Sequence, residues 1–210
     1  MRNCLSARAD VKARATLLVM GLAAVLGAGC GGGGPTSARM YTLKVPEPPQ
    51  VPASPSTIII GVEHFSAATP LDDSRILCYE SPTQLKYYDE DRWVSEPTTM
   101  IPELSARYLE RMGIARQARV LPWVESMDYI LQGQILSFEE VVSDERREAR
   151  VALELTLLRF PTRQVVWDGT FRSLQPVSGD GVSAVVDALS AATHQVLKEG
   201  LTALSAQLAR

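Results

Sequence analysis

The pattern of apolar and polar positions predicts a sheet in the second half of the chain. In residues 148–159, apolar residues alternate with small or polar ones at Val151, Leu153, Leu155 and Leu157. Such alternation is typical of a strand with one buried face. The segments at 129–142 and 164–173 are also rich in strand-forming residues, and short charged turns separate all three. The pattern therefore predicts an antiparallel meander.

Shorter strands are expected before the meander. Residues 58–62 form a compact run rich in β-branched residues, which is typical of a buried strand. Residues 75–79 and 84–88 are separated by Glu-Ser-Pro-Thr, which suits a turn and predicts a hairpin. Residues 114–121 are expected to lead into a further short strand.

Two segments have helix periodicity. Between 98 and 112, apolar residues recur at Ile101, Leu104, Tyr108 and Met112, and Gly113 supplies the stop. Asp180 is placed to cap a long helix over residues 181–209, which carries one continuous apolar stripe. Such helices must cover a sheet or a partner. The predicted fold is a two-layer α+β domain, with an antiparallel-rich sheet packed by a mid-chain helix and a long C-terminal helix.

The first residues have the pattern of an export signal. Residues 15–28 carry no charge and follow a positively charged segment, but this run of 14 is too short to span a bilayer. Small residues then lead directly into Cys30, which resembles the bacterial lipobox, although Gly27 stands where Leu is usual. The resemblance implies a signal peptide over residues 1–29 and a lipidated Cys30. Because Gly31 is not Asp, it also implies the periplasmic face of the outer membrane.

Residues 30–57 are rich in Gly, Pro and Ser and are expected to be a tether, with a short strand at 41–43. The domain proper is expected over residues 58–210. The 11 residues from Cys30 to Tyr41 would form a coil of about 16–20 Å. The domain can therefore stand away from a membrane and remain attached to it.

Composition narrows the function further. The 21 Lys and Arg and 24 Asp and Glu of the whole chain become 17 and 23 without residues 1–29, a net charge of −6. This balance is unlike that of a nucleic-acid-binding protein. The sequence has no nucleotide-binding, nucleophile-elbow or zinc motif, and His64 and His194 stand far apart, so neither an enzyme nor a cofactor is expected.

Charged residues near the centre of the meander are interpreted as surface features. Glu139 and Glu140 are taken as surface carboxylates. Arg146, Arg147 and Arg150 are interleaved with acidic residues and are taken as a solvated hairpin tip.

Five features together resemble the ABC-type transport auxiliary lipoproteins. They are Cys30, the Tyr41–Leu43 element after a Gly/Pro tether, the strand at 58–62, the Tyr-rich segment 75–97, and the Asp128–Gly133 stretch. Met127 stands where the family usually has Ala. The resemblance implies an outer-membrane accessory that docks an MCE-type lipid transport system. Its partners would be a periplasmic MCE-domain protein and an inner-membrane transport protein, and the accessory could form a homo-oligomer.

Tyr87, Tyr88, Arg92 and Trp93 are the candidate partner contacts, because aromatic residues and Arg are enriched in interfaces. On this hypothesis, Tyr88→Ala weakens association and leaves unfolding unchanged. The alternative is that Trp93 and one tyrosine fill the core beneath the first helix.

Two other functions stay open: an adaptor for another envelope machine, such as a cell-wall synthase activator, and a lipid carrier with a cavity between the sheet and the long helix.

Overall fold

A computed structural model of the chain describes residues 37–48, 56–122, 126–143 and 146–209. The predicted signal peptide, Cys30, and residues 30–36 and 49–55 of the predicted tether lie outside the described residues. No helix within the described part of the chain has the length and apolar character needed to cross a membrane.

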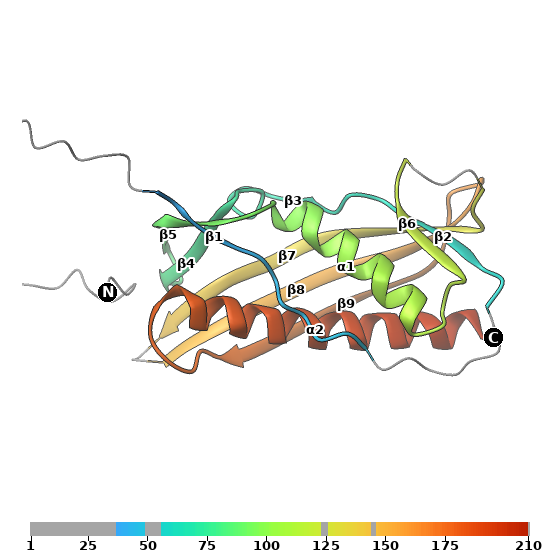
Figure 1. The fold of residues 1–210 in the computed structure, drawn as a ribbon. Helices are drawn as coiled ribbons and strands as arrows, with labels where there is room; N and C mark the ends of the chain where they lie inside the picture. The colour runs from blue at the N-terminus through green and yellow to red at the C-terminus, as the bar shows by residue number, and fades with distance from the viewer. Residues whose placement is uncertain (1–36, 49–55, 123–125, 144–145, 210) are drawn as a thin grey trace, which may run out of the picture.

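The sheet is organised around strand β7 (Tyr129–Ser143), which is 15 residues long (Figure 1). One edge of β7 pairs antiparallel with β8 (Arg146–Arg159) along its whole length. β8 in turn pairs antiparallel with β9 (Gln164–Pro176). The predicted meander is thus confirmed.

The other edge of β7 is shared by three short strands that all run parallel to it. These are β2 (Ile59–Val62), β3 (Ser66–Ala67) and β4 (Arg75–Ser81). Further out, β6 (Gln117–Val120) pairs parallel with β2. The sheet is therefore mixed, because the chain leaves and returns to β7 by crossover connections.

The predicted hairpin is formed by β4 and β5 (Gln84–Trp93), which pair antiparallel. β5 runs further than expected and receives a parallel edge strand, β1 (Arg39–Tyr41). The sequence predicted this first strand at 41–43. It lies two residues earlier, and Leu43 instead packs into the core with 9% of its surface exposed.

Helices α1 (Pro97–Arg111) and α2 (Gly181–Leu208) cover one face of the sheet. Both begin and end within one residue of their predicted bounds. Asp180 occupies the N-cap position of α2, although its side chain makes no capping hydrogen bond. The two-layer α+β class is confirmed.

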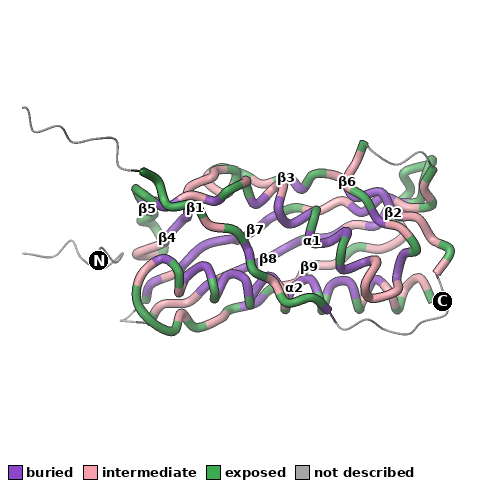
Figure 2. Tube along the Cα trace, in the orientation of Figure 1, coloured by how far each residue is buried: buried purple, intermediate pink, exposed green. Residues whose placement is uncertain are grey.

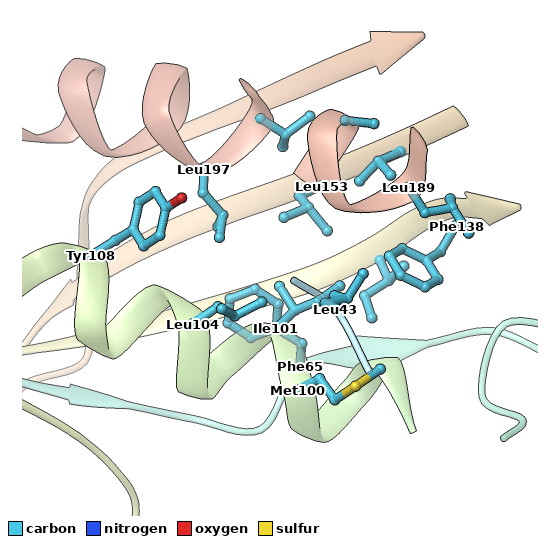
Figure 3. Packing of buried hydrophobic residues seen from close by; sticks show 14 of the residues in the cluster. Leu43, Phe65, Met100, Ile101, Leu104, Tyr108, Phe138, Leu153, Leu189 and Leu197 are labelled. Atoms are coloured by element: carbon cyan, nitrogen blue, oxygen red, sulfur yellow. The ribbon is translucent and has the colours of Figure 1, made fainter. Parts of the chain in front are cut away.

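The core lies between the helices and the sheet, as the buried segments in Figure 2 indicate. Figure 3 shows side chains from α1, α2 and the central strands filling this space. The packing is close enough to leave no room for a methyl group at some positions. A Cβ added to Gly133 of β7 would lie within 2.6 Å of the Phe65 ring, so a glycine is needed there for Phe65 to lie across the strand.

Residues 42–48, here called the strap, correct the prediction of a tether that extends to residue 57. The strap crosses the helical layer from β1 (Figure 1). The Lys44 amide donates to Ser190 Oγ of α2 at 3.1 Å, and the Tyr108 hydroxyl of α1 donates to the Pro46 carbonyl at 2.6 Å. A Pro-rich composition favours extended backbone but does not show whether a folded surface receives it.

Candidate interaction site

The predicted contacts Tyr88 and Trp93 lie in the core. Their exposed fractions are 7% and 2%, and Trp93 packs against Phe138 with ring centroids 5.4 Å apart. Such side chains cannot reach a partner while the domain is folded. The burial of these two residues weighs against the contact hypothesis and favours the packing alternative.

Tyr87 and Arg92 are half-buried and are occupied within the hairpin. The Arg75 guanidinium lies 3.7 Å from the centre of the Tyr87 ring, and the Tyr87 hydroxyl donates to the Pro70 carbonyl. Arg92 Nη1 donates to the backbone carbonyls of Tyr88 and Asp91. The four residues therefore do not form a common surface, and Cys30 lies outside the described residues.

A buried polar cluster joins the hairpin to the meander. Glu140 of β7 is fully buried and accepts hydrogen bonds from the Tyr88 hydroxyl at 2.5 Å and from Arg147 Nε at 2.6 Å. Burial, followed by the bond to Glu140, raises the pKa of Tyr88, so its hydroxyl remains a donor at all physiological pH values. Arg147 also donates to the carbonyls of Gly179 and Gly181 at the start of α2.

Glu139 forms a second ion pair. It points to the opposite face of the sheet from Glu140, because adjacent residues of a strand alternate between the two faces. Its side chain is 2% exposed and accepts from Arg150 Nε at 2.5 Å. Glu139 and Glu140 are therefore buried ion-pair residues, and interpreting them as surface carboxylates was wrong. The Arg147 side chain is only 10% exposed, whereas Arg150 remains 43% exposed, as expected for a hairpin tip. The pairing register of β7 and β8 places Arg150 directly opposite Glu139, so a correct register would have predicted this ion pair.

His194 of α2 packs against Tyr108 of α1. Its Nδ1 lies 2.6 Å from the Tyr108 hydroxyl, and burial, followed by the Lys198 charge, lowers its pKa. Burial raises the pKa of Tyr108 to about 12. Within the described ranges, no group of His, Cys, Asp and Glu is arranged to hold a metal ion.

Two open hollows lie at opposite ends of the sheet. One of about 620 Å³ lies between the tips of the β4–β5 and β7–β8 hairpins, with Tyr79, Val141 and Arg150 in its wall. The other, of about 520 Å³, lies where β7 begins and β8 ends, with Tyr129, Arg159 and Phe160 in its wall. Of these six residues, only Arg150 was singled out from the sequence, as part of a solvated hairpin tip. Phe160 could have been found as an aromatic residue in an otherwise polar turn.

The described residues define an α+β domain whose N-terminal strap fixes the preceding chain to its helical layer, and whose polar clusters hold the structure together. The chain belongs to the family of ABC-type transport auxiliary lipoprotein components, which it matches over residues 41–199. The family was the one expected from the sequence motifs.

Solved structures share the fold of this chain. Protein XCC0632 from Xanthomonas campestris is 26% identical, with a TM-score of 0.72 over 81% of this chain and 98% of that one. An uncharacterised protein has the same fold, with a TM-score of 0.64 at 13% identity over 82% of this chain and 99% of that one. No curated protein sequence matches the chain.

Proposed function

We propose that this protein is a lipoprotein of the outer membrane that acts, without catalysis, as a docking component of an MCE-type ABC lipid transport system. The observation that carries the proposal is the family match over residues 41–199, since the family consists of auxiliary lipoprotein components of ABC transport. The partners would be a periplasmic MCE-domain protein and its inner-membrane transport protein.

The anchoring part of the proposal rests on the N-terminal sequence. An export signal leads into Cys30, and lipid chains on this residue would hold the protein at a membrane essentially permanently. Because the strap and β1 bind the chain from Arg39 onwards, only eight residues, or nine residue-to-residue steps, separate Cys30 from the folded domain. A fully extended segment of that length reaches about 30 Å.

A non-catalytic role is supported by the state of the buried polar groups. Among the described residues, every buried side-chain nitrogen and oxygen has a hydrogen-bond partner. Glu139 and Glu140, the most deeply buried carboxylates, are each paired with an arginine. Carboxylates held in this way stabilise a fold and are poorly placed to act as general bases.

The packing of α2 disfavours a lipid carrier with a cavity between the sheet and this helix. A Cβ added to Gly200 would lie 2.9 Å from Leu155 and 3.1 Å from Phe171, so helix and sheet are in direct contact there. Leu189, Leu197 and Leu201 fill the rest of the same interface and are fully buried.

Co-purification from native membranes tests the proposal. The full-length tagged protein and its Cys30→Ala form would be isolated in parallel, and bound proteins identified by mass spectrometry. We expect an MCE-domain protein and its membrane partner with the wild type, and their loss with Cys30→Ala. Recovery of a cell-wall synthase instead would favour the adaptor function.

A further inference from the structure

An exposed apolar and charged patch lies at the end of the sheet where β8 turns into β9. We define the far-end patch as Tyr129, Arg159 and Phe160, together with the 520 Å³ hollow that they line with Asp128. Phe160 is 41% exposed. Large apolar side chains that remain exposed next to a hollow are a common feature of protein interaction sites.

Backbone hydrogen bonds from neighbouring segments hold Phe160 in place. Its amide donates to the Asp128 carbonyl at 2.9 Å, and the Asp128 carboxylate accepts from the Ile59 amide of β2 at 2.8 Å. The Arg163 amide closes the turn by donating to the Arg159 carbonyl at 2.7 Å. The ring is therefore presented on a fixed backbone, which reduces the entropy that a partner must overcome on binding.

The patch also carries one charge of each sign, from Arg159 and from Asp128, which line the same hollow. The Arg159 guanidinium lies 5.4 Å from the centre of the Tyr129 ring, within the range of a cation–π interaction. Arg159 is exposed and takes part in no ion pair with another residue in the described part of the chain. Its charge is thus available to a carboxylate on another molecule.

The position of the patch restricts what can reach it. The chain towards Cys30 leaves from β1 at the left of Figure 1, and the β8–β9 turn lies at the right. β7 alone has 15 residues, and the 14 steps between its first and last residue span about 46 Å at about 3.3 Å per step. The far-end patch therefore lies at the opposite end of the sheet from the strand that leads towards Cys30.

We propose that the far-end patch docks a partner protein whose contact surface presents an apolar side chain beside a carboxylate. The inference rests on the proposed function and identifies the surface that meets the periplasmic partner. A bilayer is a poor occupant because the tether attaches at the opposite end.

Site-specific photo-crosslinking in the full-length, membrane-anchored protein tests this inference. A photoreactive residue would replace Phe160, and a matched control would replace Leu85, which is 40% exposed at the opposite, β4–β5 tip. We expect a crosslink to the MCE-domain protein from position 160 and none from position 85. A crosslink from position 85 alone would overturn the docking surface and leave the proposed function intact.

Two substitutions give an independent measurement. Phe160→Ala and Arg159→Glu should each reduce recovery of the MCE-domain protein at least about tenfold, while Leu85→Ala leaves it unchanged. Equal thermal unfolding of all three variants would exclude a folding defect. Wild-type recovery by both patch variants would contradict the inference. A crosslink from position 160 to another envelope protein would support the far-end patch as a docking surface and contradict the MCE-domain partner. Recovery of no envelope protein with the wild type would contradict both the docking surface and the proposed function.

Discussion

Glu140 shows how a charged residue can be stable inside this domain. A carboxylate without solvent loses its hydration, and this loss is offset only when charged and hydrogen-bonding partners surround it. Arg147 supplies the charge and Tyr88 the second donor. The three residues come from three strands, so the cluster stabilises the arrangement of the β4–β5 hairpin against the meander.

Removing either partner of Glu140 should therefore destabilise the fold by different amounts. Arg147→Met leaves a buried charge uncompensated and should lower the free energy of unfolding by about 3–5 kcal/mol. Tyr88→Phe leaves one oxygen without a donor and should lower it by about 1–3 kcal/mol. Urea denaturation would measure both. Arg111→Met serves as a control, because its exposed pair with Glu47 contributes at most about 1 kcal/mol.

Because Tyr88 bonds to the buried Glu140, we no longer expect Tyr88→Ala to leave unfolding unchanged. A variant of Tyr88 that unfolds like the wild type would show that the buried cluster contributes nothing to stability. The sequence could not reveal the cluster directly, because adjacent carboxylates in a strand look the same whether they face solvent or an arginine across the hairpin.

His194 should give the domain a pH dependence near neutrality. Its pKa is lowered in the folded state, so the unfolded chain binds more protons as the pH falls through about 6.5. The free energy of unfolding should therefore fall between pH 7.5 and 5.5. Glu63 and Asp73, whose pKa values are lowered below 4.5 and 3.8, lose their contribution only at lower pH.

His194→Asn tests this assignment because an amide can still meet the Tyr108 hydroxyl but does not titrate. The variant should show a flatter dependence of unfolding free energy on pH between 7.5 and 5.5. An unchanged slope would mean that other groups cause the pH dependence.

At the scale of elements, the strap holds the N-terminal part of the described chain against both helices. It joins α1 and α2 through Tyr108 and Ser190, and Leu43 inserts between the layers. Because backbone hydrogen bonds to buried side chains slow amide exchange, the strap should be protected although its sequence resembles that of a linker.

Hydrogen exchange monitored by mass spectrometry would measure this protection. The Lys44 amide should exchange more slowly than an unstructured amide in the wild type and should become faster in Ser190→Ala. Leu43→Ala should loosen the whole strap and lower the free energy of unfolding by about 2–3 kcal/mol. Exchange at unstructured rates in the wild type would contradict the docking of the strap.

For the whole molecule, sequence periodicity predicted the long elements and their order. The helix stripes and the alternation in β8 depend on local spacing, so their bounds could be predicted closely. The second edge of β7 could not be predicted, because β2, β3 and β4 reach it from distant parts of the chain. Contacts between distant parts of the chain also explain why the candidate site could not be predicted correctly from the sequence. Tyr88 and Trp93 have the composition of an interface, but β5 turns them towards the core.

The arrangement of the whole molecule suits a protein that connects other components. One end is expected to face the membrane through a short tether, and the far-end patch lies at the other. The protein supplies rigidity between these ends, which a two-layer core with a 28-residue helix provides. Energy for transport would come from the partner that binds nucleotide.

A genetic test of the outer-membrane barrier addresses the central claim most directly. Detergent sensitivity would be compared in strains that lack this protein, the MCE-domain partner, or both, with complementation by wild type and by Cys30→Ala. If the protein acts only within that transport system, the double deletion is no more sensitive than either single deletion, and Cys30→Ala fails to complement. Additive sensitivity in the double deletion, or full complementation by Cys30→Ala, would contradict a membrane-anchored docking component of that system.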